Sequence, residues 1–376
     1  MKIAGIIAEY NPFHRGHEYQ IQALRGMGYD GFIAAISGNF VQRADAALTD
    51  KYRRAEAAVR SGADLVLELP LPYAVASAED FGTGGVTVLS ATGVLDAICC
   101  GCESGNEKNL RQYEALQKAE AAGTVGEKMK VGLSYPAACR SAVIESGEDW
   151  SDEPNDVLAL AYRKAIDRIA PQLPMIAIER KGSYHGNSAG FESAESIRNR
   201  LALGESVEES LPEGSYEIIK SAPYADLTRL ERGILAYYRT VSPDELKNYY
   251  GMREGLPERI CKSAGAFTLT ELYDQVKTKR FPHSAIRRAV LCGYLKIPEK
   301  LPKITYLRVL SFNEKGQEIL KEMKGKATLP VCSRLSPEMR NDPLVQAQLR
   351  GDEIFALTLP NPGTPLQDLT ESAKKI

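Results

Sequence analysis

The 376-residue sequence has four histidines, seven cysteines and one tryptophan, and it has no long apolar run. Because no run reaches about 18 apolar residues, we expect no membrane-spanning helix. The first apolar segment, residues 3–7, is too short for a signal peptide and predicts a buried β-strand. Cysteines without an export signal are typical of free thiols in a cytoplasmic protein, which is where we expect this chain.

Common nucleotide-binding and metal-binding motifs are missing as well. No GxxxxGK[ST] motif occurs, and no GxGxxG fingerprint follows the first expected strand. The glycine-rich segment 82–85 follows an expected helix and predicts a structural turn. Cys99, Cys100 and Cys102 are close in sequence, but neighbours on a strand point to opposite faces and chelate one ion poorly. No second Cys/His pair complements them, so we predict no metal site.

The charge is unevenly distributed along the chain. The formal net charge is −2, but residues 251–350 carry 19 Lys and Arg against 10 Asp and Glu. A basic block on an otherwise acidic chain favours a polyanionic partner for that block, such as nucleic acid. A solvated, helix-rich surface is the alternative explanation.

The first half of the chain alternates apolar runs with helical patterns, which predicts an α/β fold with a doubly wound parallel sheet. We assign residues 1–205 to this domain, with a loop over about 122–154. The expected strands are Ile3–Ala8, Phe32–Ile36, Leu65–Leu69, Ala97–Cys100 and Pro174–Ile178. The expected helices are Glu18–Met27, Asp50–Ser61, Asn106–Ala121, one that begins near Asn155, and Ser193–Leu203.

Residues 206–376 predict a second, mainly helical domain. Its expected helices are Leu227–Tyr238, Pro243–Tyr249, Thr270–Val276, Ser284–Tyr294 and Lys315–Met323. One strand is expected over Ile304–Phe312. The last 50 or so residues contain many prolines and predict an irregular tail packed on the body.

The segment from Glu9 to His17, with the sequence EYNPFHRGH, carries the strongest chemical signal. It follows the first expected strand and opens the first expected helix, where free N–H groups bind phosphates. Gly16 lets a nucleotide approach the backbone closely. His14 and His17 are three residues apart and can both donate to charge that develops on a phosphate chain. The flanking sequence supplies no clear third metal ligand.

This motif resembles the HxGH signature of the nucleotidyltransferase superfamily. Together with SGNFVQR at residues 37–43, it looks like the bacterial tRNA(Met) cytidine acetate ligase family. Further segments that fit are Asn155-Asp156, Arg180 with Tyr184-His185, residues 193–198 and residues 276–281. The resemblance extends to about Lys315.

The resemblance implies a reaction and a site. Members activate acetate with ATP as acetyl-adenylate and transfer the acetyl group to N4 of the wobble cytidine of elongator tRNA(Met). ATP is therefore an expected substrate, Mg²⁺ is expected with it, and acetate and tRNA are the expected partners. We expect Ser193 and Arg198 beside the phosphates, and His14 and His17 to be catalytic. The family's ATP site corresponds here to Ile7, Ala8, Glu9, Tyr10, Asn11, Pro12, Phe13, His14, Arg15, Gly16, His17, Glu18, Tyr19, Gln20, Gly101, Asn155 and Arg180.

The chain departs from the family pattern at three places. After Arg43, the expected Gly-Glu-Pro is replaced by residues 44–46 (Ala-Asp-Ala). Cys102 stands where a Ser or Thr is expected. Glu195 replaces a usual Thr and places an acid beside the predicted phosphate site.

Several basic residues are candidates for tRNA binding: Arg43, Lys277, Lys279, Arg280, Arg287 and Arg288. Phe281 and His283 lie among them and could stack on bases. A solvated helix end is the alternative. Lys51, Arg53 and Arg54 open an expected helix and are either solvated or face phosphate or tRNA. His185 either lines the site or lies in a surface loop.

Two other functions stay open at this point. A small-molecule adenylyltransferase of coenzyme synthesis shares the HxGH chemistry but needs no basic block. A non-catalytic tRNA-binding protein could use the same site to sense ATP. Changing His17 to Ala separates the enzyme from the sensor, because only the enzyme would lose turnover.

Overall fold

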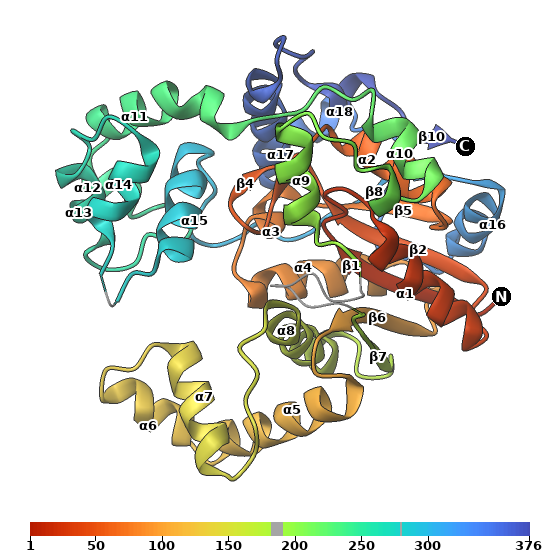
Figure 1. Ribbon diagram of the computed structural model, residues 1–376, viewed down its shortest axis with the longest axis horizontal. Helices are drawn as coiled ribbons and strands as arrows, with labels where there is room; N and C mark the ends of the chain where they lie inside the picture. The colour runs from red at the N-terminus through yellow and green to blue at the C-terminus, as the bar shows by residue number, and fades with distance from the viewer. Residues whose placement is uncertain (182–190, 279) are drawn as a thin grey trace.

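The computed structural model describes residues 1–181, 191–278 and 280–376, and within them the centre is one eight-stranded sheet (Figure 1). The strand order is β10-β8-β5-β2-β1-β6-β7, with β9 paired to β8. The pairs among β5, β2, β1, β6 and β7 are parallel, whereas β8 runs antiparallel to β5. The strands are β1 (Ile3–Ala8), β2 (Gly31–Ser37), β5 (Leu65–Leu69), β6 (Ala97–Cys102), β7 (Met175–Glu179), β8 (Leu307–Phe312), β9 (Val331–Cys332) and β10 (Lys374–Lys375).

The five parallel strands place a ligand crevice at a defined point. The chain runs outward from β1 through β2 to β5, and then returns to the other side of β1 with β6 and β7. Ligands of such sheets bind beyond the carboxyl ends of the strands where the order reverses, which is here between β1 and β6. The predicted α/β doubly wound class is confirmed, with one antiparallel edge added.

Helices cover both faces of the sheet because successive strand residues point to opposite sides. Ile6 packs with α1 (Arg15–Gly26) and α2 (Lys51–Arg60), whereas Ile7 packs with α4 (Ala78–Ser90) and α8 (Pro154–Ile169). The connection from β5 to α4 includes the short helix α3 (Leu71–Ala74). The predicted alternation of strand and helix is thus confirmed along the first half of the chain.

The prediction of a turn at residues 82–85 is wrong, because these glycines lie inside α4. Their role is close packing rather than chain reversal. A Cβ on Gly85 would lie 2.7 Å from Cγ2 of Ile7, and one on Gly84 would lie 2.6 Å from Cβ of Tyr73. The missing side chains therefore let α4 approach β1 and α3 more closely than any larger residue would allow.

The expected loop over 122–154 is also wrong. After α5 (Asn106–Ala121), the chain forms α6 (Thr124–Lys130) and α7 (Tyr135–Glu145). The three helices share a small core that includes Leu116, Val125, Ala138 and Val143. Glycines with positive φ, Gly123 at 78° among them, separate these helices and give the segment its loop-like composition.

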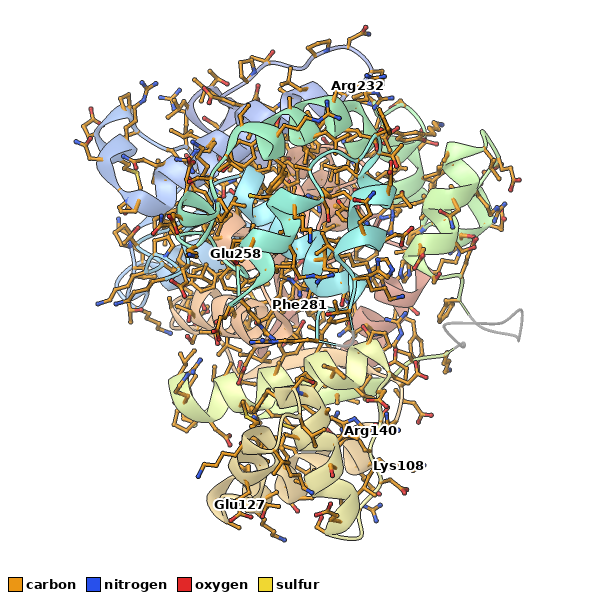
Figure 2. The ribbon with its side chains drawn as sticks, turned by 90° about the vertical axis from the view of Figure 1, so that its left-hand side faces the viewer. Lys108, Glu127, Arg140, Arg232, Glu258 and Phe281 are labelled. Carbon is orange, nitrogen blue, oxygen red and sulfur yellow. The ribbon has the colours of Figure 1, made fainter. Side chains whose placement is uncertain are left out.

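A second helical group follows the sheet domain. After α9 (Ala194–Ala202) and α10 (Glu213–Ile219), the chain builds α11 (Glu231–Thr240), α12 (Pro243–Leu246), α13 (Leu256–Lys262), α14 (Leu269–Val276) and α15 (His283–Tyr294). These last five helices enclose their own apolar core. Figure 1 shows this group and α5–α7 extending from the same side of the sheet domain. Figure 2 faces that side, with Arg232, Glu258 and Phe281 on the upper group and Lys108, Glu127 and Arg140 on the lower one.

The chain then returns to the sheet. β8 pairs with β5, α16 (Glu314–Met323) follows, and β9 and β10 both pair with β8. The predicted strand and helix at 304–323 are confirmed. The sheet is not confined to residues 1–205, the range predicted for the first domain. Its strands β8, β9 and β10 come from the second part of the sequence. The tail contains α17 (Pro343–Phe355) and α18 (Gln367–Thr370). Among the described residues, no helix has both the length and the apolar character needed to cross a membrane.

Candidate active site

A pocket of about 500 Å³ lies beyond the carboxyl ends of β1, β6 and β7. Its floor is the segment after β1, and its walls come from the first residues of α8, from α9 and from α15. Its volume falls in the range of small-molecule and cofactor sites, about 300–1,000 Å³. The position at the reversal of strand order agrees with the crevice that the topology predicts.

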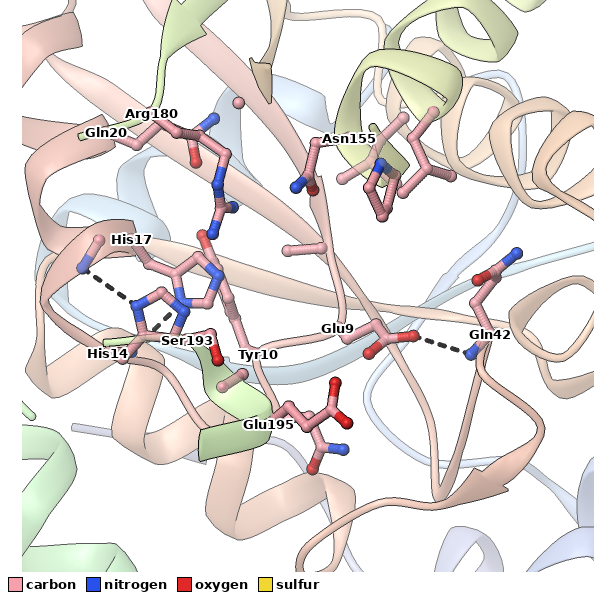
Figure 3. Close-up of a pocket in the computed structure, with 18 of the residues that line it drawn as sticks. Glu9, Tyr10, His14, His17, Gln20, Gln42, Asn155, Arg180, Ser193 and Glu195 are labelled. Atoms are coloured by element: carbon pink, nitrogen blue, oxygen red, sulfur yellow. Dashed lines mark hydrogen bonds between the residues drawn. The ribbon is translucent and has the colours of Figure 1, made fainter. Parts of the chain in front are cut away.

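His14 and His17 lie together in this pocket at the start of α1 (Figure 3). Nδ1 of His14 accepts the N–H of Gly16 at 3.0 Å, and Nδ1 of His17 accepts the N–H of His14 at 3.2 Å. Because both Nδ1 atoms accept, the ring proton of each neutral imidazole lies on Nε2. The rings stack with centroids 3.8 Å apart. Both rings therefore present N–H donors from fixed positions.

The electrostatics of the pair keep both rings neutral. Burial, together with the nearby charges of Arg180 and Arg198, lowers the pKa of His14 to about 3. Burial also holds the pKa of His17 well below its ordinary value, with His14 and Arg180 adding to the effect. At neutral pH the pair can thus donate hydrogen bonds to an anion without carrying charge or accepting a proton.

Cationic side chains from β7, α9 and the loops surround the pair. Arg180 follows β7, lies 3.9 Å from Glu103 and packs over Gly101. Arg198 donates to the carbonyl of Asn11 at 2.8 Å. Lys181 also lines the pocket. Positive charge around neutral donors at a helix N-terminus suits a polyphosphate.

Two further predicted residues are held by their own local contacts. Asn155 is near the N-terminus of α8, where its Nδ2 donates to Glu103. Ser193 is the N-cap of α9, and its Oγ accepts from the N–H of Ser196 at 3.2 Å. Both residues line the pocket, so each helix is oriented with its N-terminus toward the same space.

The structure brings most of the predicted ATP-binding residues to the pocket wall. Those that line it are Ile7, Ala8, Glu9, Tyr10, Asn11, His14, Gly16, His17, Tyr19, Gln20, Gly101, Asn155 and Arg180. The other four, Pro12, Phe13, Arg15 and Glu18, are not in the lining. Phe13 is buried in the core beneath α1, and Arg15 is exposed and donates to the carbonyl of Glu209. Nucleotide binding by individual residues stays a prediction.

The departures from the family pattern have local consequences. Glu195 pairs with Arg43 at 2.8 Å, so the acid beside the pocket is accompanied by a cation. Ala44 adopts φ 59°, a left-handed conformation that favours glycine, which the family pattern has here. Asp45 lies 3.6 Å from Arg287, and burial raises the pKa of its carboxyl group.

The remaining basic candidates are dispersed. Arg288 lines the pocket. Lys277 and Arg280 are exposed on the helical group, with Arg280 3.9 Å from Glu254. Lys279 and His185 lie outside the described residues. Binding of tRNA by these side chains stays a prediction.

Three side chains suggested as solvated or RNA-facing are buried instead. Phe281 is packed in the core of the helical group, so the prediction that this ring stacks on bases is wrong. Lys51 and Arg54 are completely buried at the start of α2, and only Arg53 of that trio reaches solvent. Both buried cations are satisfied by internal oxygens: Lys51 by three carboxylates and Arg54 by backbone carbonyls.

The cysteines of β6 lie as the strand period predicts. Cys99 packs on the α1 side of the sheet and Cys100 on the α4 side. Burial raises the pKa of Cys99 to about 12, so its thiol stays protonated. In the described part of the chain, no three His, Cys, Asp or Glu side chains group as metal ligands would.

Glu9 and Gln42 have no separate role that the sequence alone predicts, although both lie in the EYNPFHRGH and SGNFVQR motifs. The carboxylate of Glu9 accepts the backbone N–H of Gln42 at 2.9 Å (Figure 3). Glu9 came only as part of the stretch after β1, and Gln42 only as part of SGNFVQR. Their pairing across two loops has no spacing signal in the sequence.

Comparisons with known proteins agree with this geometry. Residues 1–368 match the family model described as HIGH Nucleotidyl Transferase. A tRNA(Met) cytidine acetate ligase of Thermosipho africanus is 34% identical, with 91% of this chain and 86% of that protein covered. One of Clostridium kluyveri is 35% identical with 92% of each covered. The crystal structure of Thermotoga maritima TmcAL bound with alpha-thio ATP superposes with a TM-score of 0.89 at 31% identity, covering 100% of this chain and 99% of that one.

Proposed function

Because this chain belongs to the tRNA(Met) cytidine acetate ligase family of HIGH nucleotidyl transferases, we propose that it acetylates a tRNA cytidine at the expense of ATP. It activates acetate as acetyl-adenylate and transfers the acetyl group to N4 of the wobble cytidine of elongator tRNA(Met). The observation that supports this most directly is the pair of neutral Nε2–H donors at the N-terminus of α1, set among arginines in a pocket.

In the first step, an oxygen of acetate attacks the α-phosphorus of ATP, and pyrophosphate leaves. Negative charge accumulates on the phosphate oxygens and on the leaving group. Nε2–H of His14 and His17 would stabilise this charge, and Arg180 and Arg198, which line the same pocket, would hold the pyrophosphate. No covalent bond to the protein is needed, so catalysis here is positioning and charge stabilisation.

Mg²⁺ is expected to accompany ATP. Among the described residues no ready-made cluster of metal ligands exists, so the ion would be held chiefly by phosphate oxygens and water. The bound ion would screen the phosphate charge during displacement.

In the second step, N4 of cytidine attacks the acetyl carbon, and AMP leaves. The exposed residues Lys277 and Arg280 of the helical group would contact tRNA phosphates, which makes binding depend on salt. The target base would have to leave the anticodon stack to reach the pocket.

The test follows labelled acetate with ATP, Mg²⁺ and bacterial tRNA, and it measures both acetyl-adenylate and labelled nucleosides by mass spectrometry. The wild type should yield N4-acetylcytidine. His17→Ala removes one donor to the transition state and should slow adenylate formation about 10²–10³-fold. His283→Ala is the matched control for adenylate formation, a step that needs no tRNA, because His283 is partly exposed and lies next to Asp274 outside the pocket. Salt-sensitive tRNA binding without turnover would contradict the proposal.

A further inference from the structure

Glu9 places an available carboxylate oxygen in the pocket. Its Oε1 accepts the N–H of Gln42 at 2.9 Å, which fixes the side chain between the histidines and the turn that follows the short strand β3 (Phe40–Val41) (Figure 3). Within the described ranges, its Oε2 has no hydrogen-bond partner, and no Lys, Arg or His forms an ion pair with it. A half-buried carboxylate held in this way can accept an N–H from a ligand.

Arg288 approaches the same peptide from α15. Its Nη2 donates to the carbonyl of Gln42 at 3.3 Å. Its Nε is buried without a partner in the part of the chain that the structure describes, and no carboxylate there pairs with this guanidinium. The backbone of Gln42 therefore connects an acceptor, Glu9, with a donor, Arg288, and both line the pocket.

An acceptor next to a donor matches one edge of cytosine. The exocyclic N4 amine of cytosine donates hydrogen bonds, and N3 and O2 accept them. Carboxylates recognise the cytosine amine, and arginine recognises acceptor atoms of bases. Uracil has an acceptor, O4, at the position of the amine, and this atom would face the carboxylate of Glu9 unfavourably.

We propose that Glu9 and Arg288 together recognise the target cytosine, with Glu9 accepting from its N4 amine and Arg288 donating to N3, an atom that carries a proton in uracil. The inference rests on the proposed function, and it assigns the second step to residues other than the histidines. It also identifies the end of the pocket at which the base enters.

Glu9 is also the group that takes the proton released in the transfer. The N4 lone pair forms a bond to the acetyl carbon, the bond from that carbon to the phosphate oxygen breaks, and its electron pair leaves with AMP. N4 then has one proton too many, which passes to Oε2 of Glu9 and from there to water. Both histidines already carry a proton on Nε2 and use Nδ1 as an acceptor, so neither is a suitable base.

Two other carboxylates near the pocket, Glu195 and Glu103, are already engaged with neighbouring groups. Glu195 pairs with Arg43. Glu103 accepts from the side chain of Asn155 and from the N–H of Asp156. Glu9, which has one oxygen bonded to the loop and the other open to the pocket, is the better placed acceptor.

The first experiment supplies acetyl-adenylate directly with an anticodon stem-loop RNA and measures transfer in a single turnover. Because ATP is not needed and acetyl-adenylate is supplied at a saturating concentration, neither a defect in the first step nor weaker binding of the adenylate can mimic the expected result. Glu9→Gln should slow transfer about 100-fold or more, the usual contribution of a general base. Glu9→Asp, which keeps a carboxylate, should be slowed less. Glu107→Gln is the matched control, since Glu107 is exposed on α5 away from the pocket.

Two outcomes separate this inference from the proposed function. If the wild type fails to transfer from supplied acetyl-adenylate, the proposed function is wrong. If the wild type transfers and Glu9→Gln matches it, only the role of Glu9 is wrong. Equal losses in Glu9→Gln and Glu9→Asp would show that this side chain acts through packing and would also overturn the inference.

The second experiment measures base discrimination. Stem-loops with C or U at the target position compete with labelled RNA for binding to the wild type, to Arg288→Gln and to Arg232→Gln. In Arg288→Gln, the ratio of the affinities for the C and U stem-loops should decrease about tenfold. The control Arg232 is exposed on α11 and lies outside the pocket. Equal weakening of both stem-loops by Arg288→Gln would indicate a contact to a phosphate or to O2, which both bases share, and would refute recognition of N3 by Arg288.

Discussion

Replacing Lys51 by methionine tests the most unusual feature of the core. The side chain of Lys51 is 0% exposed, and its Nζ lies 2.8 Å from Glu68, 3.3 Å from Asp352 and 2.6 Å from Asp368. Arg308 adds a second buried cation, 3.6 Å from Asp368. The carboxylates come from β5, α17 and α18, so this one lysine joins the sheet to the tail of the chain.

The expected loss of stability follows from the buried carboxyl groups that Lys51→Met leaves without their cation. Burial and the neighbouring carboxylate of Asp368 hold the pKa of Asp352 well above its ordinary value, which favours its protonated form in the folded chain. Burial also raises the pKa of Glu68 to about 7, so at pH 8 the cluster balances two cations against the carboxylates of Glu68 and Asp368. Methionine removes one cation and leaves an uncompensated buried charge, which should lower the free energy of unfolding by about 3–5 kcal/mol.

The loss should grow as the pH rises. Without the ammonium group of Lys51, one more buried carboxyl group of the cluster, besides Asp352, must stay protonated in the folded chain. In the unfolded chain the same group ionises above pH ~4. The folded state then binds more protons than the unfolded state, so its stability falls with increasing pH.

Urea unfolding at pH 5 and pH 8, followed by circular dichroism, checks this prediction. Arg53→Met is the matched control, because Arg53 lies two residues away on the same helix and is 43% exposed beside Asp50. The guanidinium of Arg53 is exposed, and Asp50 keeps its hydrogen bonds from the N–H groups of Tyr52 and Arg53, so losing this pair should cost only about 0–1 kcal/mol. If Lys51→Met and Arg53→Met unfold within about 1 kcal/mol of each other at both pH values, the reasoning about the buried cluster is refuted.

Two further perturbations test the packing of α4 and the state of the histidines. Gly85→Ala should destabilise the protein by about 1–3 kcal/mol, since its Cβ would meet the stiff side chain of Ile7 at 2.7 Å. Gly126→Ala, on an exposed part of α6 with nothing within 4 Å, should instead stabilise it by up to about 1 kcal/mol; thermal unfolding that shows the same sign for both would contradict this. As the pH is lowered from about 6.5, the unfolding free energy of the wild type should decrease more steeply than that of His14→Asn. The difference in slope should reach up to about 1.4 kcal/mol per pH unit. The reason is that folded His14 stays neutral down to about pH 3 whereas the unfolded chain takes up a proton, and parallel urea curves at pH 7, 6 and 5 would refute it.

The sheet could be predicted from the sequence because its signal is local. Buried parallel strands are continuous apolar runs, and β5 has the predicted bounds of Leu65–Leu69. The first helix begins at Arg15 rather than Glu18, because His14 acts as its N-cap, a role that the usual cap residues do not suggest. The HxGH motif also has a local signal, because its strand, turn and helix are adjacent in the chain. The sequence could therefore predict the floor of the pocket.

The rest depended on contacts between distant residues. Lys51 and Arg54 have the charge and spacing of a solvated helix end, and nothing nearby in the sequence marks them as buried. The partners of Lys51 include Asp352 and Asp368, about 300 residues away along the chain. Likewise, α6 and α7 have little local helix signal and are stabilised by the small core they share with α5.

The SGNFVQR segment shows how such distant contacts reach the pocket. Arg54 donates to the carbonyls of Ser37 and Gly38, and Asn39 bridges the tail and α2: its Nδ2 donates to Asp352, and its Oδ1 accepts from the N–H of Lys51. An amide is suited to this position because it supplies a donor and an acceptor together. Three residues later, Gln42 accepts from Arg288 and donates to Glu9. The segment that positions Glu9 and Arg288 is thus held by hydrogen bonds to buried charged side chains. One of these, Asp352, comes from the tail, for which the sequence predicted only irregular packing.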